Sequence, residues 1–304
     1  MSDTRSDVTI RSGSDDLAAW LYQPQSNSGP APCVVMAHGF SATRRDALPA
    51  YAEHFAAAGF GVVLFDYRGF GDSAGEPRQV ISIRRQQQDY EAVVAFARRQ
   101  SWVDPERIAV FGSSFSGGHA IDVAAGDPRI AAVVVQAPFA DGLAQLRITP
   151  PLNALRMTVD GIRDLIRGAR GRAPILIKAA GPPGTYAVLT APEAGPGFDS
   201  IVAPDSRWQN AIGARIMLFV GAWRPVRTAA KVRCPMLVCV CDGDATTPPA
   251  AAIKLAGNAP RAEVVHYPIG HFAIYIGDHF DRAIADQTQF LERVLQPARV
   301  AAAA

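Results

Sequence analysis

The chain has 304 residues, of which 49% are hydrophobic and 19% are charged, and its formal net charge is +2. This length and composition fit one large α/β domain with an insertion and a sizeable apolar core. The small net charge gives no general case for binding nucleic acid or a membrane surface, and no apolar run approaches the length of a membrane-spanning helix.

The N-terminus and the cysteines indicate a cytoplasmic protein. Residues 1–5 lack the basic-then-apolar pattern of a secretion signal. All four cysteines lie in or beside apolar, strand-like runs, which favours reduced thiols packed as small hydrophobic side chains. They are Cys33, Cys234, Cys239 and Cys241. Cys239 and Cys241 stand two residues apart without a second Cys/His pair nearby, so no zinc site is expected.

Strands and helices alternate along the first 140 residues. The runs Val8–Ile10 and Leu17–Tyr22 predict a hairpin around a turn at residues 13–16. Uninterrupted apolar runs then predict buried strands at 33–37, 62–65, 107–111 and 130–136. Apolar residues at helical spacing predict helices at 48–58, 84–100 and 115–125. This alternation predicts an α/β fold with a doubly wound, mostly parallel sheet.

The alternation breaks between about Asp141 and Lys231. Residues 171–204 are rich in Gly, Pro and Ala and predict an irregular stretch, with helices predicted at 152–170 and 209–220. We interpret 141–230 as an inserted, partly helical cap, and 1–140 with 231–304 as the core domain. The alternation resumes with a strand at 236–241, a helix at 249–257, a strand at 262–267 and a helix at 279–295.

The stretch Val110–His119 joins a predicted strand to a predicted helix. Gly112 and Ser114 match a G-x-S-x-G motif, but its last position is Ser116, followed by two glycines. In such an elbow the serine hydroxyl stands over the end of the sheet, and the helix N-terminus offers N–H groups to an oxyanion. The motif predicts Ser114 as a nucleophile, with a plain Gly/Ser turn as the alternative.

Further candidate residues follow two later strands. Asp242 and Asp244 come after the strand at 236–241, and His271 comes after the last strand. Ligands of open α/β sheets bind at the carboxyl ends of the strands, so these side chains are expected near Ser114. The chain order Ser, Asp, His is that of α/β-hydrolases.

Four stretches carry a resemblance to a known family. They are His38–Phe40, Asp66–Ser73, the elbow, and the segments around Asp244 and His271. On these residues the chain resembles the α/β-hydrolase superfamily, especially its bacterial dienelactone-hydrolase-like and X-Pro-peptidase-like serine esterase branches. The resemblance covers about residues 9–136 and 235–295.

The resemblance implies a serine hydrolase with a catalytic triad. Ser114 would be the nucleophile, and His271 would act as base and then as acid. Asp244 would be the orienting acid, and it is preferred to Asp242 because its spacing to the following prolines resembles the family pattern. The backbone N–H groups of Phe40 and Phe115 would form the oxyanion hole.

The string at residues 69–74 also fits a loose dinucleotide fingerprint, but Gly75-Glu76-Pro77 stands where a helix should begin. The resemblance explains this string as a loop beside the site, with Arg68 and Asp72 in structural polar contacts.

The predicted reaction is hydrolysis of a carboxylic ester, with thioesters and lactones close behind, and it needs no metal or organic cofactor. Phe40, Phe115, Tyr186 and Trp208 are predicted to bind the substrate, a small ester-like molecule. Two rival hypotheses are a peptidase or carbon–carbon bond hydrolase with the same triad, and a non-catalytic member that binds a ligand. The sequence is compatible with either a homodimer or a monomer.

Overall fold

The computed structural model describes residues 5–24 and 29–296, and the predicted lack of a secretion signal therefore falls largely outside the described residues. Within them, an eight-stranded sheet has the order β1-β2-β4-β3-β5-β6-β10-β11. The strands are β1 (Arg5–Ser12), β2 (Asp15–Tyr22), β3 (Ala31–Ala37), β4 (Gly61–Phe65), β5 (Val103–Ser113), β6 (Ile130–Gln136), β10 (Met236–Cys241) and β11 (Ala262–Tyr267). All neighbours from β4 to β11 pair in parallel, and β2 pairs antiparallel with β1 and β4.

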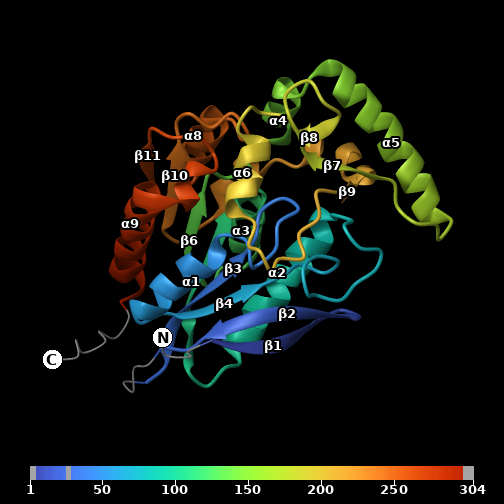
Figure 1. Cartoon of the computed structure of the whole chain (residues 1–304). Coiled ribbons are helices and arrows are strands. Elements are labelled where there is room, and N and C mark those ends of the chain that lie inside the picture. Colours follow the sequence, from blue (N-terminus) through green and yellow to red (C-terminus); the bar gives the residue numbers. More distant parts are fainter. Residues whose placement is uncertain (1–4, 25–28, 297–304) are drawn as a thin grey trace.

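Helices cover both faces of this sheet (Figure 1). One face packs on α2 (Ile83–Arg98), α3 (Phe115–Gly126) and α8 (Pro249–Asn258), and the other on α1 (Leu48–Ala57) and α9 (Gly277–Leu295). In β3, Val35 packs in the first core, whereas Val34 and Met36 pack in the second. Side chains of a strand alternate between faces, so a continuous apolar run fills both cores. The predicted doubly wound α/β fold is confirmed.

Two local predictions for the core need correction. The hairpin turn is only Gly13-Ser14, because Asp15 pairs with Ser12 in the ladder. The strand before the elbow begins at Val103 instead of residue 107, because Val103 pairs with Ala31 of β3 before the register shifts.

Much of the segment between β6 and β10 lies above the sheet in Figure 1. It contains α4 (Gly142–Ile148), α5 (Pro151–Ala169), β7 (Leu176–Ala180), β8 (Ala187–Leu189), α6 (Ala194–Ile201), β9 (Ile212–Gly213), η1 (Ala214–Leu218), η2 (Val220–Ala222), α7 (Pro225–Thr228) and η3 (Ala229–Lys231). We call residues 141–230 the inserted segment. The predicted division of the chain into a core domain and a separate cap at residues 141–230 stays a prediction.

The predicted helix at 152–170 is confirmed as α5, but two other predictions for the inserted segment are wrong. Residues 171–204 contain β7, β8 and α6, and β8-β7-β9 make a three-stranded sheet. Residues 209–220 form no α-helix, because Ile212 pairs with Ile177 of β7 and the N–H of Gly213 donates to Gln79 O at 2.7 Å. None of the helices in 5–24 and 29–296 has the length and apolar character needed to cross a membrane.

Candidate active site

Ser114 stands in a strained turn between β5 and α3. Its backbone has φ 56° and ψ −120°, a conformation that a residue with a side chain adopts only when its surroundings impose it. The surroundings leave little space: a Cβ on Gly112 would lie 2.3 Å from Ser116 O, and one on Gly117 would lie 2.8 Å from Pro138 Cβ. The glycines around Ser114 therefore allow the tight crossing from strand to helix that the elbow motif predicts.

Ser116, the departure from G-x-S-x-G, is accommodated by a polar partner. Its buried hydroxyl accepts a hydrogen bond from the Tyr67 hydroxyl at 3.3 Å. The close contact with Pro138 falls instead on Gly117, one position later. The shift of the glycine therefore leaves the elbow intact.

The structure brings Ser114, His271 and Asp244 into one hydrogen-bonded array. The Ser114 Oγ lies 3.0 Å from His271 Nε2, and His271 Nδ1 lies 2.6 Å from Asp244 Oδ2. Asp242 takes no part in this array. Its carboxylate pairs instead with Nδ1 of the exposed His266 at 2.7 Å. Of the two aspartates, Asp244 is the one that meets His271.

Asp244 is held by the turn that follows it, through contacts that were not predicted from the sequence. Its Oδ1 accepts the backbone N–H groups of Thr246 and Thr247 at 2.7 and 2.6 Å, and its Oδ2 accepts the Thr247 hydroxyl at 2.7 Å. These donors orient the carboxylate toward His271. The threonines two and three residues after an aspartate are a usable sequence signal for such a turn.

Burial and charge oppose each other at this array. Burial favours a neutral Asp244, but the His271 charge and the hydrogen bonds to the carboxylate outweigh it and lower the pKa of Asp244. Burial likewise disfavours a charged His271, but the carboxylates of Asp244 and Glu193 and the hydrogen bond to Asp244 raise the pKa of His271 above its usual value. The array thus stabilises an imidazolium next to a carboxylate.

Phe40 and Phe115, the predicted oxyanion donors, both lie beside Ser114. Phe115 is the first residue of α3, where backbone N–H groups have no partner within the helix. The chain before Phe40 lies directly against the nucleophile, because a Cβ on Gly39 would be 3.2 Å from Ser114 Cβ. The Phe40 and Phe115 rings meet edge to face at 5.5 Å between centroids.

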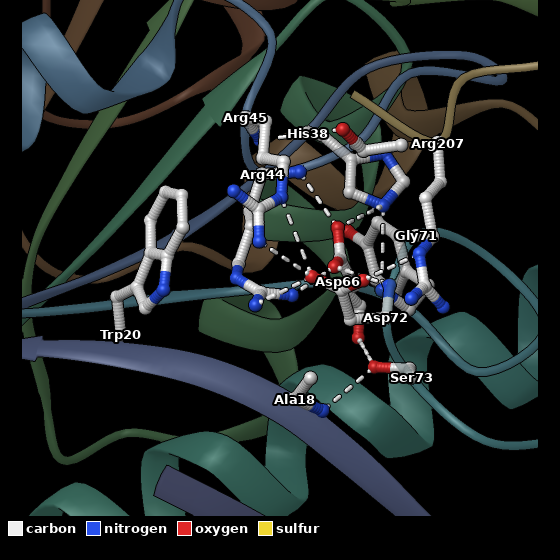
Figure 2. A network of polar contacts seen from close by, with 12 residues as sticks. Ala18, Trp20, His38, Arg44, Arg45, Asp66, Gly71, Asp72, Ser73 and Arg207 are labelled. Atoms are coloured by element: carbon white, nitrogen blue, oxygen red, sulfur yellow. Dashed lines mark hydrogen bonds and ion pairs between the residues drawn. The ribbon is translucent and has the colours of Figure 1, made fainter. Parts of the chain in front are cut away.

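A buried ionic network fixes the loop after Phe40 (Figure 2). The Asp66 carboxylate accepts the backbone N–H of Arg44 at 2.6 Å and also binds the Arg44 guanidinium, which reaches Asp72 at 2.9 Å. The Trp20 ring lies 4.6 Å from that guanidinium. A Cβ on Gly71 would be 2.2 Å from Asp66 Oδ2, so this position needs glycine.

The same network gives a structural role to the loop at residues 69–74, whose sequence fits a loose dinucleotide fingerprint. Asp72 also binds Arg45 at 3.0 Å, and Arg68 donates to the buried Asp89 at 2.6 Å. The predicted structural contacts of Arg68 and Asp72 are confirmed.

Two small cavities meet at Ser114 and share Phe40 and Leu189 as walls. One has about 50 Å³ and a mainly aliphatic and aromatic lining from the core and the inserted segment, and the other has about 30 Å³ and lies beside His271. The first is lined by Phe40, Ser114, Phe115, Phe139, Gly142, Gln145, Leu146, Thr149, Val188, Leu189, Ile216, Met217, Val220, Thr246 and Thr247. The second is lined by Gly39, Phe40, Ala42, Asp46, Leu48, Ser113, Ser114, Leu189, Phe198, Ile201, His271, Phe272 and Tyr275.

The predicted substrate-binding residues are only partly at these cavities. Phe40 and Phe115 line them, but Tyr186 and Trp208 do not. The Tyr186 hydroxyl donates to Asp160 at 2.6 Å, and Trp208 stacks on Phe198 at 5.2 Å. Both aromatic rings were predicted from residue type alone, which does not show the direction of a side chain.

Gln145 adds a polar group to the larger cavity. Its Nε2 donates to Thr246 O at 3.1 Å, while its buried Oε1 makes no hydrogen bond to another described group. Across the described residues, no three or more His, Cys, Asp or Glu side chains form a group that could hold a metal ion.

The chain is similar to several known proteins. The family model of the X-Pro dipeptidyl-peptidase (S15 family) matches residues 12–149. The quorum-quenching protein AidA of Acinetobacter baumannii is 38% identical over 289 residues, which cover 95% of each chain. The thiohydrolase aneE of Aspergillus aculeatus is 38% identical over 138 residues, which cover 45% of this chain and 42% of the fungal protein.

A solved structure supports the fold independently. The crystal structure of the α/β hydrolase GrgF from Penicillium superimposes with a TM-score of 0.83, covering 96% of this chain and 99% of that one at 23% identity. At that identity the likeness establishes the fold alone.

Proposed function

We infer that this chain, which belongs to the α/β-hydrolase superfamily and to the same family as the quorum-quenching protein AidA, hydrolyses carboxylic esters through an acyl-enzyme on Ser114. The chain is a serine-type hydrolase. The observation that carries the proposal is the continuous contact from Ser114 Oγ through His271 to Asp244, at 3.0 and 2.6 Å.

The proposed mechanism assigns each group one task. His271 Nε2 takes the proton of Ser114 as the hydroxyl attacks the carbonyl carbon, and Asp244 stabilises the resulting imidazolium. The N–H groups of Phe40 and Phe115 donate to the oxyanion. His271 then protonates the leaving alcohol, and water, activated by the same imidazole, releases the acid from Ser114.

The cavities support an ester with a largely apolar acyl group. The larger one is mostly apolar apart from Ser114, Gln145 and three threonines. Thioesters and lactones have the same reacting carbonyl as simple esters, so they are included in the proposal. Two relatives are named a thiohydrolase and a quorum-quenching protein. The proposed partner is therefore a small molecule, and no metal or organic cofactor takes part in the proposed steps.

A peptidase is the second candidate, because the matching family model is that of a dipeptidyl-peptidase. The same array cleaves an amide if the leaving amine is protonated by His271. Nitroanilides ending in proline distinguish this activity from ester hydrolysis. Two further alternatives are cleavage of a carbon–carbon bond by the same triad and ligand binding without catalysis. In either case the folded protein would turn over neither the esters nor the nitroanilides.

The test is hydrolysis of nitrophenyl esters from acetate to decanoate by wild type and Ser114→Ala. Turnover by wild type should fall by at least about 10³-fold in the variant, with the fold unchanged by circular dichroism. Equal turnover by both proteins would contradict the proposal. The chain-length profile reports the acyl size that the cavities admit.

We also propose a homodimer that packs through α5. This helix turns an apolar stripe outward, whose side chains are 41–62% exposed: Leu152, Leu155, Val159, Ile162 and Ile166. The stripe is nearly symmetric about Val159, so two antiparallel copies of α5 would match apolar side chains with one another. Exposed apolar stripes of this kind are typical of interaction sites.

Light scattering tests the dimer. Wild type should show twice the 32.3 kDa chain mass, and Ile162→Glu should be monomeric. Ile253→Glu is the matched control, because Ile253 is similarly exposed but lies on α8. A monomeric wild type would contradict the proposal.

The proposed compartment is the cytoplasm, on the ground of buried, unpaired thiols at Cys33, Cys239 and Cys241.

A further inference from the structure

Glu193 reaches from the inserted segment to both loops that carry the triad. Its Oε2 accepts the backbone N–H of His271 at 2.9 Å. Its Oε1 accepts the backbone N–H of Ala245 at 3.0 Å and lies 3.2 Å from the Thr246 hydroxyl. Ala245 and Thr246 directly follow Asp244, so one carboxylate bridges the loop of the base and the loop of the acid.

The chain leaves room for this carboxylate. A Cβ on Gly270 would lie 2.2 Å from Glu193 Oε2, so a side chain at this position would displace the carboxylate from its place next to His271. On the other side of the histidine, a Cβ on Gly197 of α6 would lie 2.2 Å from the Phe272 ring. The inserted segment therefore packs against the residues on both sides of His271.

The same part of the segment forms walls of the cavities. Leu189 lines both of them, and Phe198 lines the smaller one. Ser114 lines both cavities as well, so a substrate that reaches the nucleophile lies against this part of the segment. A change in how the segment sits against the core would therefore alter these walls and the contacts of Glu193 together.

We propose that Glu193 is a positioning residue that couples the seating of the inserted segment to the assembly of Ser114, His271 and Asp244. It fixes the backbone of His271 relative to Asp244, and it adds a second negative charge beside the imidazole. The inference rests on the proposed function and assigns a control point within it.

The charge makes the coupling measurable. Burial opposes protonation of His271, and the carboxylates of Asp244 and Glu193 raise its pKa against that effect. Two other titratable groups beside Asp244, the Cys241 thiol and the Tyr275 hydroxyl, have pKa values raised by burial, that of Tyr275 to about 12, and stay neutral in the working range. Removing the Glu193 charge should therefore lower the pKa of His271 and move the acid limb of activity to lower pH.

The first test compares Glu193→Gln with wild type over pH, using nitrophenyl acetate. The acid limb of kcat/KM should move down by about 0.5 to 1 pH unit. kcat should fall about 10-fold or more with little change in KM, because misplaced catalytic groups slow chemistry more than binding. Asp199→Asn is the matched control, since it removes an exposed carboxylate from α6 and should change neither quantity.

A second readout does not depend on turnover. The His271 ring can be titrated by NMR in wild type and in Glu193→Gln, and its pKa should be lower in the variant. Gly270→Ala keeps the charge of Glu193 but displaces its carboxylate, and it should shift the titration in the same direction. Unchanged titration and an unchanged acid limb in Glu193→Gln would overturn the inference. Absence of Ser114-dependent turnover in wild type would instead refute the proposed function, and the NMR titration would still decide the coupling.

Discussion

Replacing each of the two neighbouring aspartates by asparagine gives a sharp test of the proposed acid. Asp244 is 7% exposed and contacts His271 Nδ1 at 2.6 Å, whereas Asp242 pairs with His266 at the surface. The two residues lie in one turn and the two substitutions are chemically identical. They therefore compare the same chemical change at two carboxylates that differ in contacts and burial.

The expected cost of Asp244→Asn follows from its four hydrogen bonds. The amide oxygen can still accept the N–H groups of Thr246 and Thr247, which places the amide N–H₂ group toward His271. A donor there opposes the tautomer in which Nδ1 carries the proton, and the negative charge that stabilises the imidazolium is lost. In triads this change costs about 10³- to 10⁴-fold in kcat, equal to about 4 to 5.5 kcal/mol.

The assay is hydrolysis of a short nitrophenyl ester, with circular dichroism and thermal unfolding to check each fold. Asp242→Asn should keep kcat within about threefold of wild type, because an exposed ion pair contributes little. Equal losses in both variants, or a larger loss in Asp242→Asn, would refute the assignment of Asp244.

Three further predictions follow from the site. Activity should fall with decreasing pH, because the raised pKa of His271 leaves more of the imidazole protonated at a given pH. The midpoint of this acid limb should lie above about pH 6.5, the usual pKa of histidine, and a midpoint below that value would contradict the prediction. Arg44→Ala should lower the free energy of unfolding by about 3 to 5 kcal/mol in urea titrations, because it leaves the buried Asp66 carboxylate without its guanidinium partner. The exposed Arg129→Ala should leave the free energy of unfolding almost unchanged. Gln145→Leu should lower KM for apolar acyl esters several-fold relative to acetate, since it removes a buried acceptor from the cavity, and an unchanged ratio would count against this.

The core of the fold was predictable because its signals are local. Continuous apolar runs such as 33–37 and 236–241 coincide with buried strands of the parallel sheet. A glycine-flanked serine, an aspartate and a histidine after successive strands were expected at one edge, and the structure brings Ser114, Asp244 and His271 there together.

The inserted segment was predictable only in part. The stripe of α5 has clear helical spacing, but a strand as short as β9 has no periodicity to read. Residues 212–213 take their conformation from pairing with β7, a contact made across more than thirty residues of sequence. The direction of a side chain such as Trp208 depends on the same distant packing.

The role of Glu193 has almost no signal in the sequence. It binds backbone N–H groups, which every residue except proline offers, so its partners cannot be recognised by type. The one trace is Gly270 next to His271, whose missing side chain makes room for the carboxylate.

The central claim is that Ser114 is an activated nucleophile, and covalent labelling tests it most directly. Wild type is treated with a fluorophosphonate and digested, and the modified peptide is identified by mass spectrometry. A single adduct on Ser114, formed much more slowly in His271→Ala, is the predicted result. No adduct on a folded wild-type protein, or an adduct on another residue, would contradict the account.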